Sequence, residues 1–567
     1  MKRQAALIFS LLVLGFSAAA AAAPQDNPVQ RQQQILQQKE QEQAAKRAEQ
    51  ELQRRAGRDM AKAQRQGSPL AAFALPEEAN SFKIKSFSLK ASRYAYKFQW
   101  INDYLAGFNG QRIGVQGINL LLQNINNEIM NRGYLTTRIY IESQNLASGK
   151  LYFTLLPGVI GDIRFRQKTW GTWTNAMPVR RGSLLNIRDI EQAIDNFNSV
   201  PGQEADIKIE PGAQEGQSDL VIDIKRGRPW KLILSLDNSG TRDTGKVQMS
   251  GALQLMQPLS ANDIFYVSWN EDATESGETK GTRANSIYYS IPFGKERFTY
   301  SRSKNDYHQT VTYAVNPFIS SGEFTNDTLT WTHLVQRNQS SKTDFELGFT
   351  HKTRHSYING TEIEVQRQKT TVLLAGFNHR QYLGRSVLDT SLKWQKGLPW
   401  YADAGPTDGM SGEATTRYNM YHLGLNFTAP VPFGEGYDAQ YNVSIRGQKS
   451  DQRVYGSEFF TIGGFYSVRG FDGEQTLAAE DGIVVRNELR FPIEKYPHLL
   501  YLALDYGKVH GPSTEYLLGT ELVGGAVGMR GKIGSLQYEA FVGWPIKRPD
   551  GFICDSRTYG FLLTAEI

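Results

Sequence analysis

From Trp230 to the end of the chain, the sequence is a succession of short segments in which apolar and polar side chains alternate. The segment YDAQYNVSIRG sets tyrosines, alanine, valine and isoleucine against aspartate, glutamine, asparagine, serine and arginine. The segments KLILSLD, SIYYSIPFG and MYHLGLNF repeat this pattern. Alternation with a period of two predicts β-strands that have one apolar face and one polar face.

Two all-β architectures use such strands, the soluble sandwich and the membrane barrel. A sandwich also alternates, but the face that would point inward here carries charged residues, which does not suit a packed core. Apolar-out, polar-in strands with aromatic residues near their ends are typical of outer-membrane barrels. We therefore predict a large, water-filled barrel over residues 228–567, a length that accommodates about sixteen strands with their turns.

The amino-terminal residues predict export from the cytoplasm. Residues 1–22 join Lys2 and Arg3 to an apolar run that ends in a string of alanines, the pattern of a secretory signal peptide. A membrane anchor is the alternative, and it fits less well because small and then polar residues follow. No other long apolar stretch appears, so an exported chain of this kind is either soluble or a β-barrel.

Charge and cysteine content narrow the function classes. The chain has 63 Lys and Arg against 57 Asp and Glu, a net charge of +6, which is mild for 567 residues and does not indicate a nucleic-acid partner. The single cysteine, Cys554, rules out an intramolecular disulfide and suggests no metal cage.

Residues 23–66 are rich in Gln, Glu, Lys, Arg and Ala, and no proline lies between Pro28 and Pro69. These residue types favour a helix, and the few apolar side chains form no continuous stripe. A helix that is polar all round needs water or a polar cavity about it. The alternative is a solvated or disordered leader. Residues 67–80 then have the composition of a linker.

Two small α/β modules are predicted before the barrel. Residues 81–157 show a strand, two segments with apolar residues at helical spacing, and two further strands. Residues 158–227 repeat this unit with the strand VIGDIRFRQ, the helical segment NIRDIEQAIDNFNSV, and the strands EADIKIEPG and SDLVIDIKRG. We expect two copies of one fold in tandem.

The order of these segments resembles a known family. The paired modules resemble the POTRA domains of two-partner secretion transporters, the TpsB family, in the segments RGYLTTRIYIESQNLASGKLYFTLLPGVIGDI and LNIRDIEQAIDNFNSVPG. SLDNSGTRDTG resembles that family's transition into its barrel, SVRGF resembles the loop motif of the superfamily, and GAVGMRGKIGSLQYEAFVGWPIKRP resembles its penultimate region. Each motif is short, but their order and spacing cover almost the whole mature chain.

The resemblance implies a mainly β fold: a sixteen-stranded antiparallel transmembrane barrel preceded by a helix that plugs the lumen and by two periplasmic POTRA domains. It implies a monomeric pore in a Gram-negative outer membrane that exports an unfolded adhesin, haemolysin or contact-dependent-inhibition exoprotein. Expected partners are that exoprotein, outer-membrane lipid and the barrel assembly machinery, with no nucleic acid. An outer-membrane protein insertase of the same superfamily and a solute porin are the alternatives.

One turn places a charge where the strand pattern does not require one. In GGFYSVRGFDGEQ, Arg469 stands between Val468 and Gly470 and is followed by Phe471. If the strands form a barrel, this turn enters the lumen, where the guanidinium needs an acidic partner. The resemblance implies that these four residues form the lumen loop motif.

Two carboxylates compete for Arg469. Asp505 lies on the lumen face of LLYLALDYGK, next to small residues that leave room for a folded loop, and the resemblance implies the same pairing. Glu488, on the lumen face of IVVRNELRF, is the alternative, although two arginines already flank it on that face. The sequence favours Asp505 and leaves Glu488 open.

No pattern indicates catalysis, a cofactor or a metal. His351 and His355 stand four residues apart, but we expect them in a strand and loop region, where that spacing does not set both on one face as a helix would. Phosphate-binding loops, nucleophile elbows and zinc motifs do not appear. We expect a protein that is not an enzyme.

Overall fold

The computed structural model describes residues 74–567 except 91–92, 274–276, 278–279, 312–316, 404–407, 435–436 and 494–495. The predicted signal peptide (1–22), the predicted helix (23–66) and residues 67–73 of the predicted linker lie outside this range. Among the described residues, no helix combines the length and apolar character needed to cross a membrane.

The first module folds as two helices against a small sheet. Its sheet has the order β2-β5-β4, and a short pair, β1 and β3, flanks it. The apolar faces of both helices meet this sheet around a core that includes Phe98, Ile125 and Phe153. The elements are β1 (Phe82–Lys83), β2 (Ser86–Lys90), α2 (Gln99–Ala106), β3 (Arg112–Ile113), α3 (Val115–Asn131), β4 (Arg138–Tyr140) and β5 (Lys150–Leu156).

The second module repeats the strand arrangement with one helix. Its sheet has the order β6-β8-β7, and α4 packs on it through Ile190, Ala193 and Phe197. The elements are β6 (Val159–Phe165), α4 (Ile187–Asn198), β7 (Gln203–Pro211) and β8 (Gln217–Arg226). The expected repeat therefore differs in detail, because one α-helix here stands where the first module has two.

The rest of the chain closes into an antiparallel barrel, in which sixteen long strands alternate with turns and β27 pairs with β9. A two-residue strand, β16 (Thr361–Glu362), only extends the end of β15. The long strands are β9 (Trp230–Asp237), β10 (Gln248–Met256), β11 (Ile264–Asp272), β12 (Gly281–Phe293), β13 (Glu296–Val311), β14 (Phe318–Arg337), β15 (Ser341–Ile358), β17 (Gln368–Leu383), β18 (Ser386–Asp403), β19 (Asn419–Pro432), β20 (Asp438–Ser450), β23 (Asp481–Ile493), β24 (His498–His510), β25 (Glu521–Ile533), β26 (Leu536–Lys547) and β27 (Thr558–Glu566). The predicted sixteen-stranded barrel is confirmed.

The faces of the strands follow the alternation in the sequence. On β24, Leu500, Leu502 and Leu504 are about half exposed on the outer surface, whereas Tyr501 and Asp505 are fully buried on the inner side. The outward leucines suit lipid, which is as apolar as they are.

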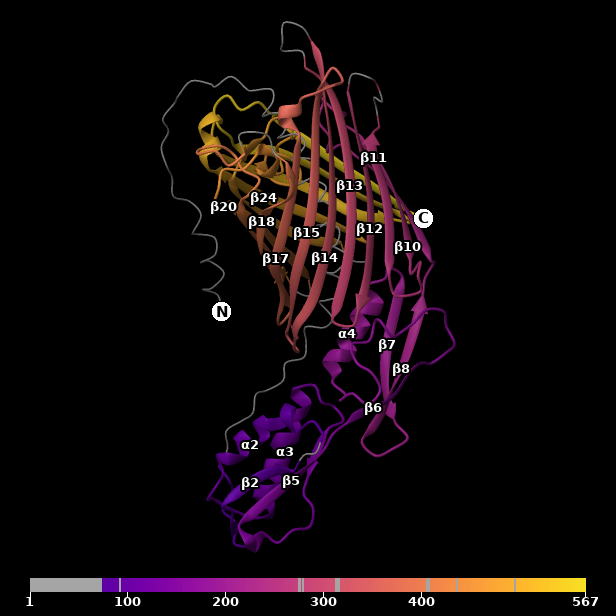
Figure 1. Ribbon diagram of the computed structural model, residues 1–567, viewed down its shortest axis with the longest axis vertical. Helices are drawn as coiled ribbons and strands as arrows, with labels where there is room; N and C mark the ends of the chain where they lie inside the picture. The colour runs from indigo at the N-terminus through magenta and orange to yellow at the C-terminus, as the bar shows by residue number, and fades with distance from the viewer. Residues whose placement is uncertain are drawn as a thin grey trace.

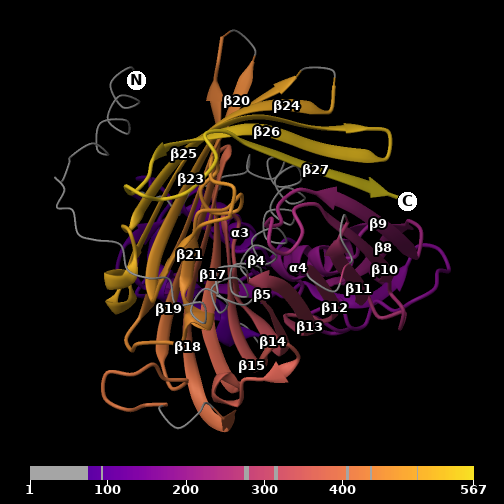
Figure 2. The same cartoon turned by 90° about the horizontal axis from the view of Figure 1, so that it is seen from above.

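Both modules lie at one end of the barrel, with the second module between the first and the strands (Figure 1). Seen from above, β21 (Phe460–Ile462) lies within the ring of strands, beside β23 (Figure 2). This element belongs to the long connection between β20 and β23, residues 451–480, which we call the lumen loop. The loop also contains the short helix η4 (Gly456–Glu458) and β22 (Leu477–Ala479), which pairs with β21.

The second module is docked against the barrel turns by buried amides. Asn175 donates to the carbonyl of Pro292 at 2.9 Å, and Asn196 of α4 donates to the carbonyl of Gly294 at 2.7 Å. These contacts give hydrogen-bond donors to carbonyls at the end of β12 and in the turn that follows it. They place α4 across the end of the barrel.

Candidate functional site: the lumen and its arginine-anchored loop

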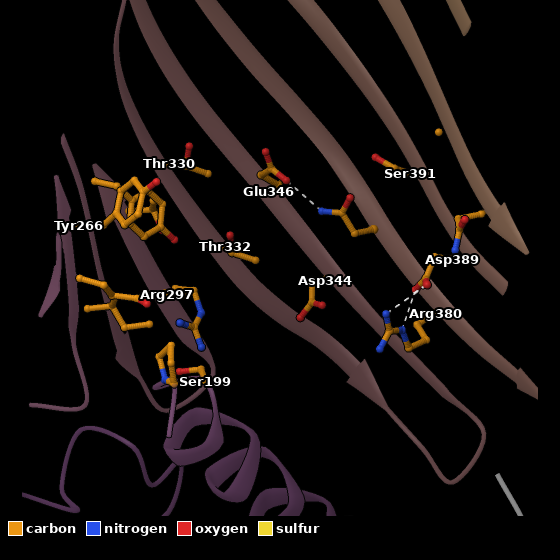
Figure 3. A pocket seen from close by; sticks show the side chains of 18 of the residues that line it. Ser199, Tyr266, Arg297, Thr330, Thr332, Asp344, Glu346, Arg380, Asp389 and Ser391 are labelled. Carbon is orange, nitrogen blue, oxygen red and sulfur yellow. Dashed lines mark hydrogen bonds and ion pairs between the residues drawn. The ribbon is translucent and has the colours of Figure 1, made fainter. Parts of the chain in front are cut away.

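A cavity of about 2540 Å³ fills the lower part of the barrel. Figure 3 shows α4 beneath it and strands of the barrel around it. The α4 residues that line it include Glu191 and Asp195, and Tyr466 of the lumen loop lines it as well. The cavity therefore lies between the second module and the lumen loop.

Many polar and charged side chains line the cavity. Thr330, Thr332 and Ser391 present hydroxyls to it (Figure 3). Several of its charged side chains are paired with one another; for example, Arg380 Nε donates to Asp389 at 2.6 Å.

Arg469 of the lumen loop is held by both candidate acids. Its Nε and Nη2 donate to the two carboxylate oxygens of Asp505 at 2.7 and 2.8 Å, and its backbone N–H donates to the same carboxylate at 3.0 Å. Its Nη1 donates to Glu488 at 2.5 Å. The side chains of Arg469, Asp505 and Glu488 are 2%, 0% and 4% exposed, so the group is shielded from water and from salt.

Glu488 belongs to a larger network that reaches the open cavity. It accepts from Arg490 at 2.5 Å and from Arg530 at 2.6 Å. Arg530 also pairs with Glu539 at 2.8 Å and lies over the ring of Tyr501, 4.4 Å from its centroid. Three arginines around one carboxylate compensate the cost of burying it.

The loop backbone rests directly on glycines of the barrel wall. A Cβ at Gly524 would lie 1.8 Å from the Arg469 carbonyl oxygen, and a Cβ at Gly543 would lie 2.8 Å from the Gly470 nitrogen. Gly470 itself has a φ of +105°, and a Cβ there would lie 2.4 Å from the carbonyl oxygen of Trp544. The loop can approach β25 and β26 this closely only because these positions lack side chains.

The other loop residues predicted from the sequence pack against the barrel through apolar contacts. Val468 and Phe471 are fully buried in an apolar cluster with Val509 and Leu522. The ring of Phe471 meets that of Phe552 edge-on at 5.8 Å. These contacts hold the turn so that the guanidinium points at its two acids.

Sequence reasoning named the loop motif and both acids but treated the acids as competitors. It missed Gly524 and Gly543, and it missed Arg530 as the link to the cavity. Arg530 could have been found from the sequence. The alternation in GAVGMRGK places Arg530 on the inner face of its strand, as the alternation in LLYLALDYGK places Asp505.

The reasoning about the two histidines was wrong in one respect. His351 and His355 both lie in β15, where an even spacing puts them on one face. They stand about 13 Å apart along the strand and bond separately, His351 to Thr371 and His355 to Glu362. Within the part of the chain that the structure describes, no group of His, Cys, Asp and Glu has the geometry to hold a metal ion.

Comparisons with known proteins agree with this architecture. The sequence profile of the family described as haemolysin secretion/activation protein ShlB/FhaC/HecB matches residues 216–531. A POTRA domain profile of the ShlB type matches residues 82–158, and a second POTRA profile matches residues 159–211.

Among curated proteins, the outer membrane transporter CdiB-2 of Burkholderia pseudomallei (strain 1026b) is 37% identical over 514 residues, which cover 87% of each chain. The outer membrane transporter CdiB of Dickeya dadantii (strain 3937) is 29% identical over 462 residues, 80% of this chain and 81% of that protein. The solved structure of CdiB from Acinetobacter baumannii has a TM-score of 0.81 at 25% identity and covers 96% of this chain and 100% of that one.

A sixteen-stranded barrel with two POTRA modules and a loop anchored in its lumen defines an outer-membrane protein that transports polypeptides. The chain belongs to the haemolysin secretion/activation family ShlB/FhaC/HecB, and it is a two-partner secretion transporter of the Gram-negative outer membrane. The fold and family expected from the sequence are confirmed.

Proposed function

We propose that this chain exports a contact-dependent-inhibition exoprotein, which crosses the outer membrane in extended form. Two named CdiB transporters among its relatives support this choice of client. The observation that carries the proposal is the polar cavity that runs from α4 of the second POTRA module to Tyr466 of the lumen loop. An unfolded chain that reaches α4 has a hydrated route into the barrel.

We propose further that the client binds first to the edge of β7. This strand begins at Gln203, directly after Gly202, which lines the cavity. Among the described residues, the outward backbone groups of residues 207–210 bond to no other segment, and Ile207 N–H reaches only the side chain of Asp206 beside it. An extended peptide can add to such an edge through backbone hydrogen bonds.

The other outer strands of the two three-stranded sheets have partners on their edges. On β2, the side chains of Asn109 and Asn102 accept from the N–H groups of Phe87 and Leu89. On β4, Asn126 bonds both backbone groups of Ile139.

The edge of β6 is covered by backbone bonds of the segment at residues 182–185, as where Ile160 N–H donates to Ser183 at 2.9 Å. Among the outer strands of the three-stranded sheets, β7 therefore has the most to gain from a new neighbour, because the edge groups of β2, β4 and β6 already have partners.

Substitution at Ile209 tests the edge. By alternation from Ala205 and Ile207, its N–H points away from β8, so Ile209→Pro removes an edge donor and keeps the ladder with β8. We expect Ile209→Pro to weaken capture of the secreted client by purified transporter about tenfold, while Ile209→Ala, which keeps the N–H, retains capture. Equal capture by both variants would move the binding site elsewhere.

Deletion of residues 81–227 separates export from simple diffusion. A transporter that takes its client from these modules stops secreting, whereas a solute porin keeps conducting ions through the barrel. The resemblance and family also support a monomer in contact with outer-membrane lipid, inserted by the barrel assembly machinery and without catalytic activity. Cleavage after residue 22 and plugging of the lumen by residues 23–66 stay predictions.

A further inference from the structure

The lumen loop contacts the barrel wall through ion pairs at three separate places, of which the Arg469 group is one. We propose that the loop is a three-point lid, in which Lys352 on β15 and Lys246 beside β10 are positioning residues that hold it as Arg469 does. The anchoring of the lumen loop can be tested without a client.

The second anchor joins η4 to β15. Lys352 Nζ donates to both carboxylate oxygens of Glu458 at 2.9 Å, and the two side chains are 11% and 10% exposed. Glu458 is 106 residues from Lys352 along the chain, so the pair is purely tertiary. Gln448 also donates to the backbone carbonyl of Glu458 at 2.7 Å.

An apolar cluster supports this second anchor. Phe459 of the loop, directly after Glu458, packs in it with Val372 of β17 and Met420 of β19. The cluster's other members are Tyr418, Val454 and Ala478. The Lys352–Glu458 pair therefore lies beside an apolar cluster, as the Arg469 group does.

The third anchor joins the loop to the turn between β9 and β10. Both carboxylate oxygens of Glu474 accept from the backbone N–H of Arg242 at 3.1 Å, and one also accepts from Lys246 Nζ at 3.3 Å. Lys246 donates in addition to the carbonyl of Asp472 at 3.2 Å. This anchor is the most exposed, with Lys246 at 31% and Glu474 at 18%.

The three anchors are spread around the ring of strands. In the strand order, β17, β18, β19 and β20 separate the β15 anchor from the Arg469 group on β23 and β24. β25, β26 and β27 separate that group from β9, and β11 to β14 separate β10 from β15. A segment that is tied at roughly equal thirds of a circle moves aside only when all of its ties release together, so removing one tie makes that opening more frequent.

The anchors also differ in burial, and burial determines the order in which these ion pairs break. An exposed pair contributes little and is weakened by salt, whereas loss of one partner from a shielded pair leaves a charge without compensation. The Glu474 anchor is therefore the first to yield, the Lys352 anchor the second and the Arg469 group the last. Opening requires more than one of them to be released.

Thiol labelling from outside the cell measures this opening. Cys554 is the only cysteine, so Cys554→Ser provides a clean background, and Ser391→Cys puts one nearly isosteric thiol on the cavity wall (Figure 3). The reagent is a maleimide carried on a polyethylene glycol chain too large for general porins, so it reaches Ser391→Cys only past the loop. Met410→Cys, at an exposed position, is the control for reagent access.

We expect Glu474→Gln to raise the labelling rate by no more than about fivefold and Lys352→Met to raise it at least about tenfold. Combining Lys352→Met with Arg469→Met gives a rate above that of either variant, because independent anchors act multiplicatively. The exchanged pair, Lys352→Glu with Glu458→Lys, returns the rate toward that of the parent. Heat-modifiable mobility on gels verifies that each barrel has folded.

Two results would overturn the proposal. One is a Lys352→Met protein that folds and labels at the parental rate, which would mean that the Lys352–Glu458 pair does not hold the loop in place. The other is an Arg469→Met protein that alone labels as fast as a variant lacking all three anchors. Should Lys352→Met fail to fold, Glu458→Gln reports on the same anchor from the loop side.

Discussion

Arg337, at the end of β14, donates to the Asp195 carboxylate of α4 at 2.7 Å and so ties the barrel to the second POTRA module. The same guanidinium donates to Glu191 at 3.2 Å and to the side-chain oxygen of Gln192 at 3.0 Å. All three partners lie within one turn of α4, the helix beneath the lumen cavity. Arg337 therefore adds to the buried amide bonds of Asn175 and Asn196 in holding α4 beneath the cavity.

Replacing Arg337 should loosen this docking of α4 without unfolding the barrel. Arg337 is 13% exposed but its two acidic partners are about one-third exposed, so we expect Arg337→Ala to cost about 1–2 kcal/mol of docking free energy. Amide hydrogen exchange in α4 should become roughly 5- to 30-fold faster, while exchange in α3 stays unchanged. Arg164→Ala, which removes an exposed arginine paired with Asp219, is the matched control and should leave α4 unaffected.

Arg469→Ala should abolish secretion of the client while the barrel still inserts. The substitution leaves Asp505 and Glu488 buried beneath the loop without this cation, a loss that typically costs roughly 3–5 kcal/mol. Client in the culture medium and heat-modifiable mobility of the transporter measure the two effects. Arg469→Lys keeps the charge but not the bidentate geometry, so it should restore secretion only in part. Normal secretion by Arg469→Ala would remove the loop from the mechanism.

Gly524→Ala should displace the loop by contact alone. The added methyl group would fall 1.8 Å from the Arg469 carbonyl oxygen, closer than any atoms can approach, so either the loop or β25 must move. We expect secretion to drop as it does for Arg469→Ala, although every charge is retained. Gly424→Ala is the control, because its new methyl group would meet nothing closer than 3.4 Å.

Glu78 should make the first POTRA module dependent on pH. Its carboxylate accepts from the N–H groups of Gly117, Gln116 and Gly114 at the start of α3, and the bond from Gly117 does most to lower the pKa of Glu78. A carboxyl whose pKa is lower in the folded protein stabilises it at pH values above the unfolded pKa. That contribution is lost as the pH falls through the folded value.

Urea unfolding, followed by the circular dichroism of the helices at 222 nm, provides the measurement. The wild-type protein should exceed Glu78→Gln in unfolding midpoint near neutral pH, and the difference should vanish in acid, where both side chains are uncharged. Glu77→Gln, one residue earlier at an exposed position, should match the wild-type protein throughout. A constant gap between wild type and Glu78→Gln at all pH values would show that the carboxylate charge is not the cause.

Local pattern was enough to find most of the architecture. The period-two alternation placed Leu502 outside and Asp505 inside, because the pleat of a strand sends successive side chains to opposite faces whatever lies beyond it. Apolar residues three and four positions apart placed α3 and α4, because the helical turn brings such residues to one face. The need of an isolated arginine for an acid in a dry site led to Arg469 and its two candidate partners.

Which acid binds Arg469 was decided only by the closed barrel, because both Asp505 and Glu488 come within reach once β23 and β24 lie side by side. The same holds for Lys352 and Glu458, whose separation of 106 residues leaves no trace in any local pattern. Periodicity is a property of neighbouring residues, and it determines which face a side chain takes. Contacts across a lumen depend on how many strands the ring contains and on where a loop re-enters it, and these are set by the packing of the whole chain.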